Sequence, residues 1–102
     1  AWQPAVLRLI GTACDGASPK GRPVGVCGEA AADPALATVL VGLGVASLSM
    51  TARALPDVDA VLKSVTLDEC RELANIAIAA ATAEDARAAV RAKLPILEEL
   101  GL

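Results

Sequence analysis

Residues 34–52 carry no charged side chain, and this uncharged stretch restricts the chain to few folds. It is nearly as long as a transmembrane helix, which needs about 20 apolar residues. However, Gly42 and Gly44 interrupt it, hydroxyl residues follow them, and neither flank carries a cluster of Lys or Arg. A buried helix that leads directly into a buried strand gives the same hydropathy. We therefore expect an α/β domain rather than a membrane span.

Clear start and stop signals bound the helix in this stretch. Asp33 is the expected N-cap, Pro34 suits the first turn, and Gly44 ends the helix. Apolar runs over residues 24–27 and 45–50 flank it and predict two short strands. Two strands joined through one helix form a βαβ unit, so we expect them to pair in parallel by a right-handed crossover.

Four more helices are expected. They run from Pro4 to near Gly16, from Pro56 or Asp57 to Leu62, from Leu67 to about Ala80, and from Thr82 to before Gly101, with a loop over residues 17–23. Thr66 and Glu69 form a capping box for the third of them, because each side chain closes a free backbone N–H. The inward face of that helix would be Leu67, Cys70, Leu73, Ala74 and Ala77. Pro95 is expected to kink the last helix.

The length of the chain limits how much of a sheet it can build. With 102 residues it allows one domain, whereas a complete (β/α)8 barrel needs about 250. Two strands cannot bury both of their faces alone. Because residues 24–26 and 45–48 are largely apolar on both faces, we expect other strands or a second copy of the chain to cover them. The chain starts without an initiator Met or a basic leader, and we expect it to be a piece of something longer.

Charge and residue types argue against several kinds of function. A net charge of −3, scattered basic residues and a single aromatic residue, Trp2, argue against nucleic-acid binding. The chain has no His, which excludes Cys-His and Ser-His pairs and imidazole metal ligands within it. Its three cysteines include no C-x-x-C pair, so neither disulfides nor a zinc site is expected. A reducing cytoplasm fits this pattern.

Cys27 is the main candidate for chemistry, because it ends the first strand run and precedes Gly28. In α/β barrels the carboxyl ends of parallel strands carry the catalytic side chains. A thiol with the ordinary pKa of about 8.5 stays protonated at neutral pH and can donate a proton. Gly25 and Gly28 would let a substrate approach the backbone. The competing interpretation is a small buried hydrophobic residue, as most free cysteines are.

Other residues near the two strand ends allow both a functional and a structural interpretation. Ser49, Met50 and Thr51 end the second strand, so they could line the same pocket as the thiol, although Met50 could equally fill the core. Glu29 could orient the site and Arg53 could pair with an anion, or both could be solvated. Purely structural interpretations are given to Asp33 (a helix cap only), to Cys14 and Cys70 (core), and to Asp57, Asp59, Glu98 and Glu99 (surface carboxylates that form no metal site).

Four segments resemble the phosphoenolpyruvate-utilising enzymes, and among them the Enzyme I family of the bacterial sugar phosphotransferase system, the phosphoenolpyruvate-protein phosphotransferases. They are residues 4–10, residues 23–34 with Cys-Gly-Glu, residues 40–45, and residues 48–50 with the sequence Leu-Ser-Met. The resemblance covers essentially the whole chain. Pyruvate phosphate dikinase and phosphoenolpyruvate synthase share the Cys-Gly-Glu element.

The resemblance implies that residues 1–102 form the carboxyl-terminal part of a phosphoenolpyruvate-binding (β/α)8 barrel, with about two parallel strands, flanking helices and a helix-rich end. It implies that Cys27 donates a proton to the methylene carbon of enolpyruvate as pyruvate forms, and Gly28 is the one further candidate for substrate binding. In that family, Mg²⁺ holds the substrate, and the phosphoryl group passes to a histidine on a separate domain and then to a phosphocarrier protein for sugar uptake. The resemblance places the metal ligands and that histidine outside this chain.

We accordingly expect a cytoplasmic protein that forms a homodimer and has neither nucleic-acid nor membrane partners. Alone, the chain is expected to be catalytically inactive. Two alternatives are the equivalent part of a dikinase or synthase, and a non-catalytic helical dimerisation module. A thiol-redox role is a third, which neither a resolving cysteine nor a cluster of cations supports.

Overall fold

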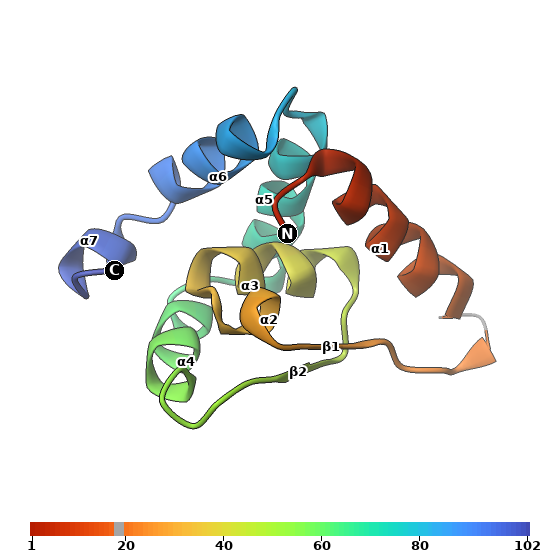
Figure 1. Cartoon of the computed structure of the whole chain (residues 1–102), viewed down its shortest axis with the longest axis horizontal. Coiled ribbons are helices and arrows are strands. Elements are labelled where there is room, and N and C mark those ends of the chain that lie inside the picture. Colours follow the sequence, from red (N-terminus) through yellow and green to blue (C-terminus); the bar gives the residue numbers. More distant parts are fainter. Residues whose placement is uncertain (18–19) are drawn as a thin grey trace.

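A computed structural model describes residues 1–17 and 20–102, so residues 18–19 of the expected loop lie outside the described residues. In these residues the fold is mixed α/β, with seven helices and two short parallel strands (Figure 1). The elements are α1 (Pro4–Ala17), β1 (Gly25–Cys27), α2 (Glu29–Ala32), α3 (Pro34–Leu43), β2 (Ser47–Ser49), α4 (Leu55–Lys63), α5 (Leu67–Ala79), α6 (Ala83–Ala92) and α7 (Ile96–Glu99).

The uncharged stretch forms helix α3 and strand β2, as expected. The Oδ1 atom of Asp33 accepts the backbone N–H groups of Ala35 and Leu36 at 3.1 and 3.3 Å, which caps the start of α3. Gly44 ends the helix in the left-handed conformation, with φ 104°, and its N–H donates to a carbonyl of the last turn. Residues 35–40 are all buried. Among the helices of residues 1–17 and 20–102, none is long and apolar enough to cross a membrane.

Strands β1 and β2 pair in parallel, which confirms the βαβ prediction. Val26 lies opposite Leu48, and both side chains are half-buried where they pack against the core. The neighbours of these two residues in each strand point to the other face of the sheet, because side chains alternate along a strand. That face is exposed in the described part of the chain, and it presents Gly25, Cys27, Ser47 and Ser49. The expectation that other strands or a second copy of the chain cover this face therefore stays a prediction.

Helix α3 lies at the centre of the fold, with the two strands on one side and α1 and α5 on the other (Figure 1). It packs most extensively against α5, and α4 and α6 also contact it. The core that these elements enclose is aliphatic and includes Leu7, Leu36, Leu40, Val61, Leu73 and Val90. The backbones of α3 and α5 lie in close contact at Gly42, where a Cβ atom would overlap the carbonyl group of Cys70.

Two details of the helical region differ from the sequence predictions. Pro95 breaks the last helix instead of kinking it, so that α6 ends at Ala92 and α7 begins at Ile96. A proline inside a helix lacks the N–H donor, and its ring clashes with the carbonyl one turn earlier. Leu67 does not belong to the inward face of α5, because it is 51% exposed in the first turn, whereas the other four expected residues are buried.

The Gly42 contact predicts a large difference between two glycine-to-alanine substitutions. Gly42→Ala should lower the free energy of unfolding by about 1–3 kcal/mol, because the new methyl group forces α3 and α5 apart. Gly16→Ala is the matched control in helix α1, since a Cβ atom at Gly16 meets nothing within 4 Å. It should be neutral or stabilise by up to about 1 kcal/mol. Thermal unfolding followed by circular dichroism measures both, and equal effects would contradict the packing described here.

Candidate functional site

The thiol of Cys27 lies at the carboxyl end of β1 and is exposed. Its partner in the register is Ser49, the last residue of β2, which is exposed as well. Because the two strands are parallel, the two side chains lie next to each other at one edge of the sheet, on the face opposite to the helical core. A thiol and a hydroxyl group therefore open onto the same side of the molecule.

Gly28 turns the chain sharply after the thiol. It has φ 86° and ψ −152°, a backbone conformation that residues other than glycine rarely adopt. Its N–H donates to the carbonyl oxygen of Ser49 at 3.1 Å, which continues the pairing of the strands beyond Cys27. A Cβ atom at Gly28 would meet nothing within 4 Å. The glycine is thus needed for the turn, and the space around it is open.

Helix α2 is a single turn that follows Gly28 and that the sequence analysis missed. The N–H of Ala32 donates to the carbonyl of Gly28 at 3.2 Å, and Ala31 is completely buried. Glu29 occupies the first turn of α2 with an exposed side chain, where its negative charge suits the helix dipole. Residues 29–32 read Glu-Ala-Ala-Ala, all strong helix formers, but four residues are too few to show a helical period.

Asp33 does more than cap α3, which corrects its interpretation as a cap only. Its Oδ2 atom accepts the indole Nε1–H of Trp2 at 3.0 Å, while Oδ1 caps the helix. Trp2 is 8% exposed and precedes α1, so the bond joins two segments that are 31 residues apart in the sequence. In the sequence, Trp2 stands out only as the single aromatic residue.

The remaining candidate site residues from the sequence differ in how exposed their side chains are. Thr51 and Arg53 are exposed and follow the carboxyl end of β2, which lies beside the end of β1 that carries Cys27. Met50 is half-buried and borders an apolar groove between β2, α3 and α4, which favours its interpretation as a packing residue.

The other two cysteines are core residues, as expected. Cys14 and Cys70 are both buried. Burial raises the pKa of each thiol above its ordinary value, and the neighbouring Asp15 and Glu69 carboxylates raise it further. Both thiols therefore stay protonated and poorly nucleophilic at neutral pH. Across residues 1–17 and 20–102, no three His, Cys, Asp or Glu side chains are grouped in a way that could hold a metal ion.

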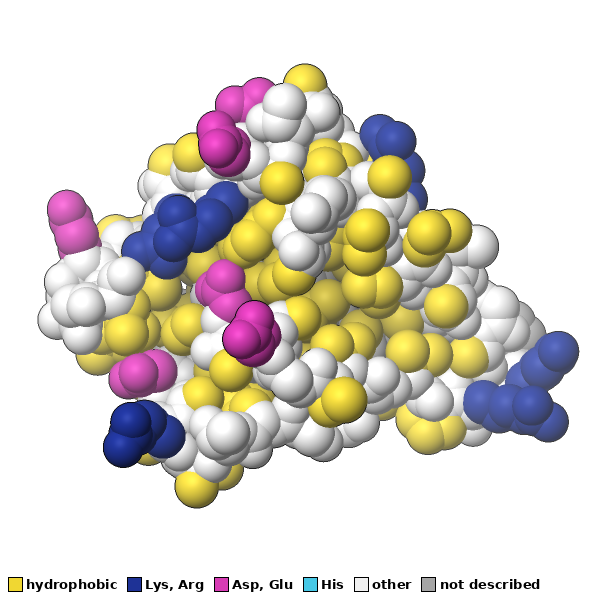
Figure 2. Space-filling model, in the orientation of Figure 1, with side chains coloured by type: hydrophobic (Ala, Val, Ile, Leu, Met, Phe, Trp, Pro, Cys, Tyr) yellow, Lys and Arg dark blue, Asp and Glu magenta, His cyan; other side chains and the backbone are white. Residues whose placement is uncertain are grey.

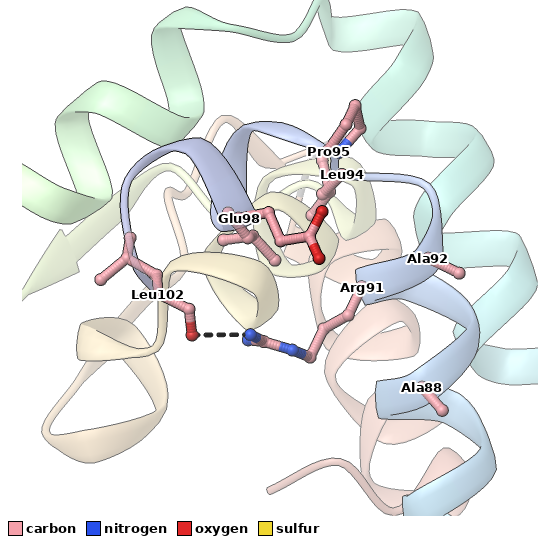
Figure 3. A pocket seen from close by; sticks show the side chains of 8 residues that line it. Ala88, Arg91, Ala92, Leu94, Pro95, Glu98 and Leu102 are labelled. Carbon is pink, nitrogen blue, oxygen red and sulfur yellow. Dashed lines mark hydrogen bonds between the residues drawn. The ribbon is translucent and has the colours of Figure 1, made fainter.

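A separate hollow lies between α6 and α7, and no residue of either strand lines it. Figure 3 shows that Arg91 points into it, where its Nη2 atom donates to the backbone oxygen of Leu102 at 2.7 Å. Glu98 borders the same hollow. A backbone oxygen thus already uses one of the five N–H donors of this guanidinium group.

Comparison with known proteins identifies the family. Residues 1–67 match the family model described as "PEP-utilising enzyme, PEP-binding domain", where PEP is phosphoenolpyruvate. The chain therefore belongs to the phosphoenolpyruvate-utilising enzymes, and the resemblance inferred from the sequence is confirmed.

Within the phosphoenolpyruvate-utilising enzymes, the chain is most usefully compared with individual relatives. Over 93 residues, 91% of this chain, it is 54% identical to the phosphoenolpyruvate-protein phosphotransferase of Streptomyces coelicolor, and the match covers 17% of that protein. It is 42% identical to the phosphotransferase of Haloferax volcanii over 78% of this chain and 14% of that protein. Identity to the multiphosphoryl transfer protein of Xanthomonas campestris is 48%, over 83% of this chain and 10% of that protein. The chain thus spans less than one fifth of the length of these relatives.

The difference in burial predicts the order in which the three cysteines react. With iodoacetamide at neutral pH, Cys27 should be alkylated first because it alone is exposed. Cys14 and Cys70 should react only after unfolding, since their raised pKa values leave little thiolate and the core shields them. Peptide mass spectrometry assigns each site, and Cys27→Ala should remove the fast phase. A fast phase that persists in this variant would contradict the placement of the thiol.

Proposed function

We propose that this chain forms the carboxyl-terminal part of the phosphoenolpyruvate-binding barrel of a phosphoenolpyruvate-protein phosphotransferase, in which Cys27 is the proton donor. One observation carries the proposal: the thiol is exposed at the carboxyl end of β1, next to the end of a parallel neighbour strand. Active sites of (β/α)8 barrels lie at that end of the sheet. The names of the relatives favour a phosphotransferase over a dikinase or a synthase.

The exposed face of the two strands supports their place in a barrel. Gly25, Cys27, Ser47 and Ser49 all lie on it, and α3 packs on the opposite face, as helices do outside a barrel. In a barrel this face would point inward, and the missing strands would pair with the free edges of β1 and β2. Hydrophobic side chains spread over much of the surface drawn in Figure 2, which also fits a chain that further protein covers.

In the proposed reaction, the thiol of Cys27 delivers a proton to the methylene carbon of enolpyruvate. The S–H bond breaks and a C–H bond forms at that carbon, while the enolate electrons form the keto group of pyruvate and a thiolate is left behind. Gly28 leaves room for the substrate because open space surrounds its Cα. A general acid has to lie within direct reach of the reacting carbon. The bond from the Gly28 N–H to the Ser49 carbonyl supports this role for Cys27, because it fixes the backbone directly after the thiol.

The Mg²⁺ ligands and the phosphohistidine of the proposed enzyme would be supplied from outside this chain. The described residues do not fit the Mg²⁺ ion of this family, because they contain no suitable group of ligands. The phosphohistidine is also supplied from outside this chain, which has no His. As partners we propose phosphoenolpyruvate, pyruvate, a phosphocarrier protein of sugar uptake and a second copy of the chain, in the cytoplasm.

The proposal predicts a specific defect in the intact gene product. Cys27→Ala should lower phosphoenolpyruvate-dependent phosphorylation of the phosphocarrier protein by at least about a hundredfold, because the general acid is lost. Phosphoenolpyruvate affinity, measured by calorimetry, should stay nearly unchanged. Cys70→Ala is the control, since that thiol is buried in the helical core, and it should keep normal turnover. Normal turnover in Cys27→Ala would remove the catalytic assignment.

A further inference from the structure

The six-residue connector from Gly28 to Asp33 joins the thiol to helix α3, and it is fixed at both ends. At its start, the Gly28 N–H donates to the Ser49 carbonyl at 3.1 Å. At its end, the Asp33 carboxylate accepts two backbone N–H groups of α3 and the indole of Trp2. Between these points Ala31 is completely buried. The connector therefore has little freedom to move while all of these bonds are made.

Of the bonds just named, only the bond to Asp33 from Trp2 has a donor outside the βαβ unit. The indole ring is 8% exposed, and a buried Trp N–H that lacks a partner is costly. Its partner is a carboxylate oxygen at 3.0 Å, and hydrogen bonds to charged acceptors are stronger than neutral ones. Figure 1 shows the start of the chain beside α2 and α3. The segment before α1 thus holds the connector against the core.

We propose that Trp2 is a positioning residue for proton transfer, and that it acts through Asp33 on the connector that directly follows Cys27; this rests on the proposed function above. Without the indole N–H, Oδ2 of Asp33 loses its partner, and α2 and Gly28 gain freedom to shift. A shift of the thiol by about 1 Å is enough to slow a reaction strongly, because the reacting atoms must be in contact.

The exchange of the methyl protons of pyruvate with D₂O tests this step directly in the intact gene product. Cys27 thiolate takes a methyl proton, the enolate forms, the thiol exchanges its proton with solvent, and deuterium returns to the carbon. Proton NMR follows the loss of the methyl signal, without any phosphoryl transfer. Trp2→Phe keeps an aromatic ring at this position, although a smaller one, and removes the N–H. It should lower the exchange rate about tenfold while the pyruvate affinity changes less than about twofold. A wild-type exchange rate in Trp2→Phe would overturn the proposal.

Asp33→Ser gives a second route to the same interaction. Serine is a good N-cap, so α3 keeps its start, but the acceptor for the indole is lost. This variant should slow exchange to a similar extent, and the Trp2→Phe/Asp33→Ser double variant should be no slower than either single one. Reductions that multiply in the double variant would overturn the proposal, because they would show that the two residues act independently.

Two controls separate positioning from other causes. Thr82→Ala removes the N-cap bond to the Asp85 N–H at the start of α6, so it should lower the thermal midpoint but keep the exchange rate. If it slows exchange as much as Trp2→Phe, general destabilisation explains the effect and the proposal fails. Cys27→Ala should abolish exchange. If exchange persists in Cys27→Ala, the proposed function is refuted. If Cys27→Ala shows no exchange while Trp2→Phe exchanges at the wild-type rate, only the role of Trp2 is refuted.

Discussion

The parallel pairing of β1 with β2 is the interaction on which the candidate site depends. Its backbone bonds begin where the Ala46 N–H donates to Val24 at 2.7 Å and extend to the bond between Gly28 and Ser49. Helix α3 connects the two strands; it is capped at both ends, and its middle is buried on all sides. The position of the site is thus fixed by the backbone hydrogen bonds between β1 and β2 next to a buried helix. The thiol belongs to the residue at the end of this series of bonds.

Local signals explain why much of the fold could be predicted from the sequence. Asp33 and Gly44 specify where α3 begins and ends through bonds within a few residues, and Thr66 with Glu69 does the same for the start of α5. The expected kink at Pro95 was wrong because a local rule gives the disruption but not its size. Whether the helix bends or stops depends on packing that distant residues provide.

The candidate site could be predicted only in part, for a similar reason. Cys27 follows from its place at a strand end, and the structure adds that the side chain is exposed. The second role of Asp33 could not be predicted, because its partner Trp2 lies 31 residues away and no spacing rule connects the two. Buried polar pairs of this kind become visible only when the tertiary structure brings their elements together.

A crystal structure of the intact gene product with pyruvate bound tests the central claim most directly. Cys27 is proposed to lie at the mouth of a barrel that other segments complete, and this position sets the expected distance. The sulfur should lie about 3.5 Å from the methyl carbon of pyruvate, as general acid catalysis requires. A sulfur turned away from the bound pyruvate, or separated from it by another side chain, would contradict the account.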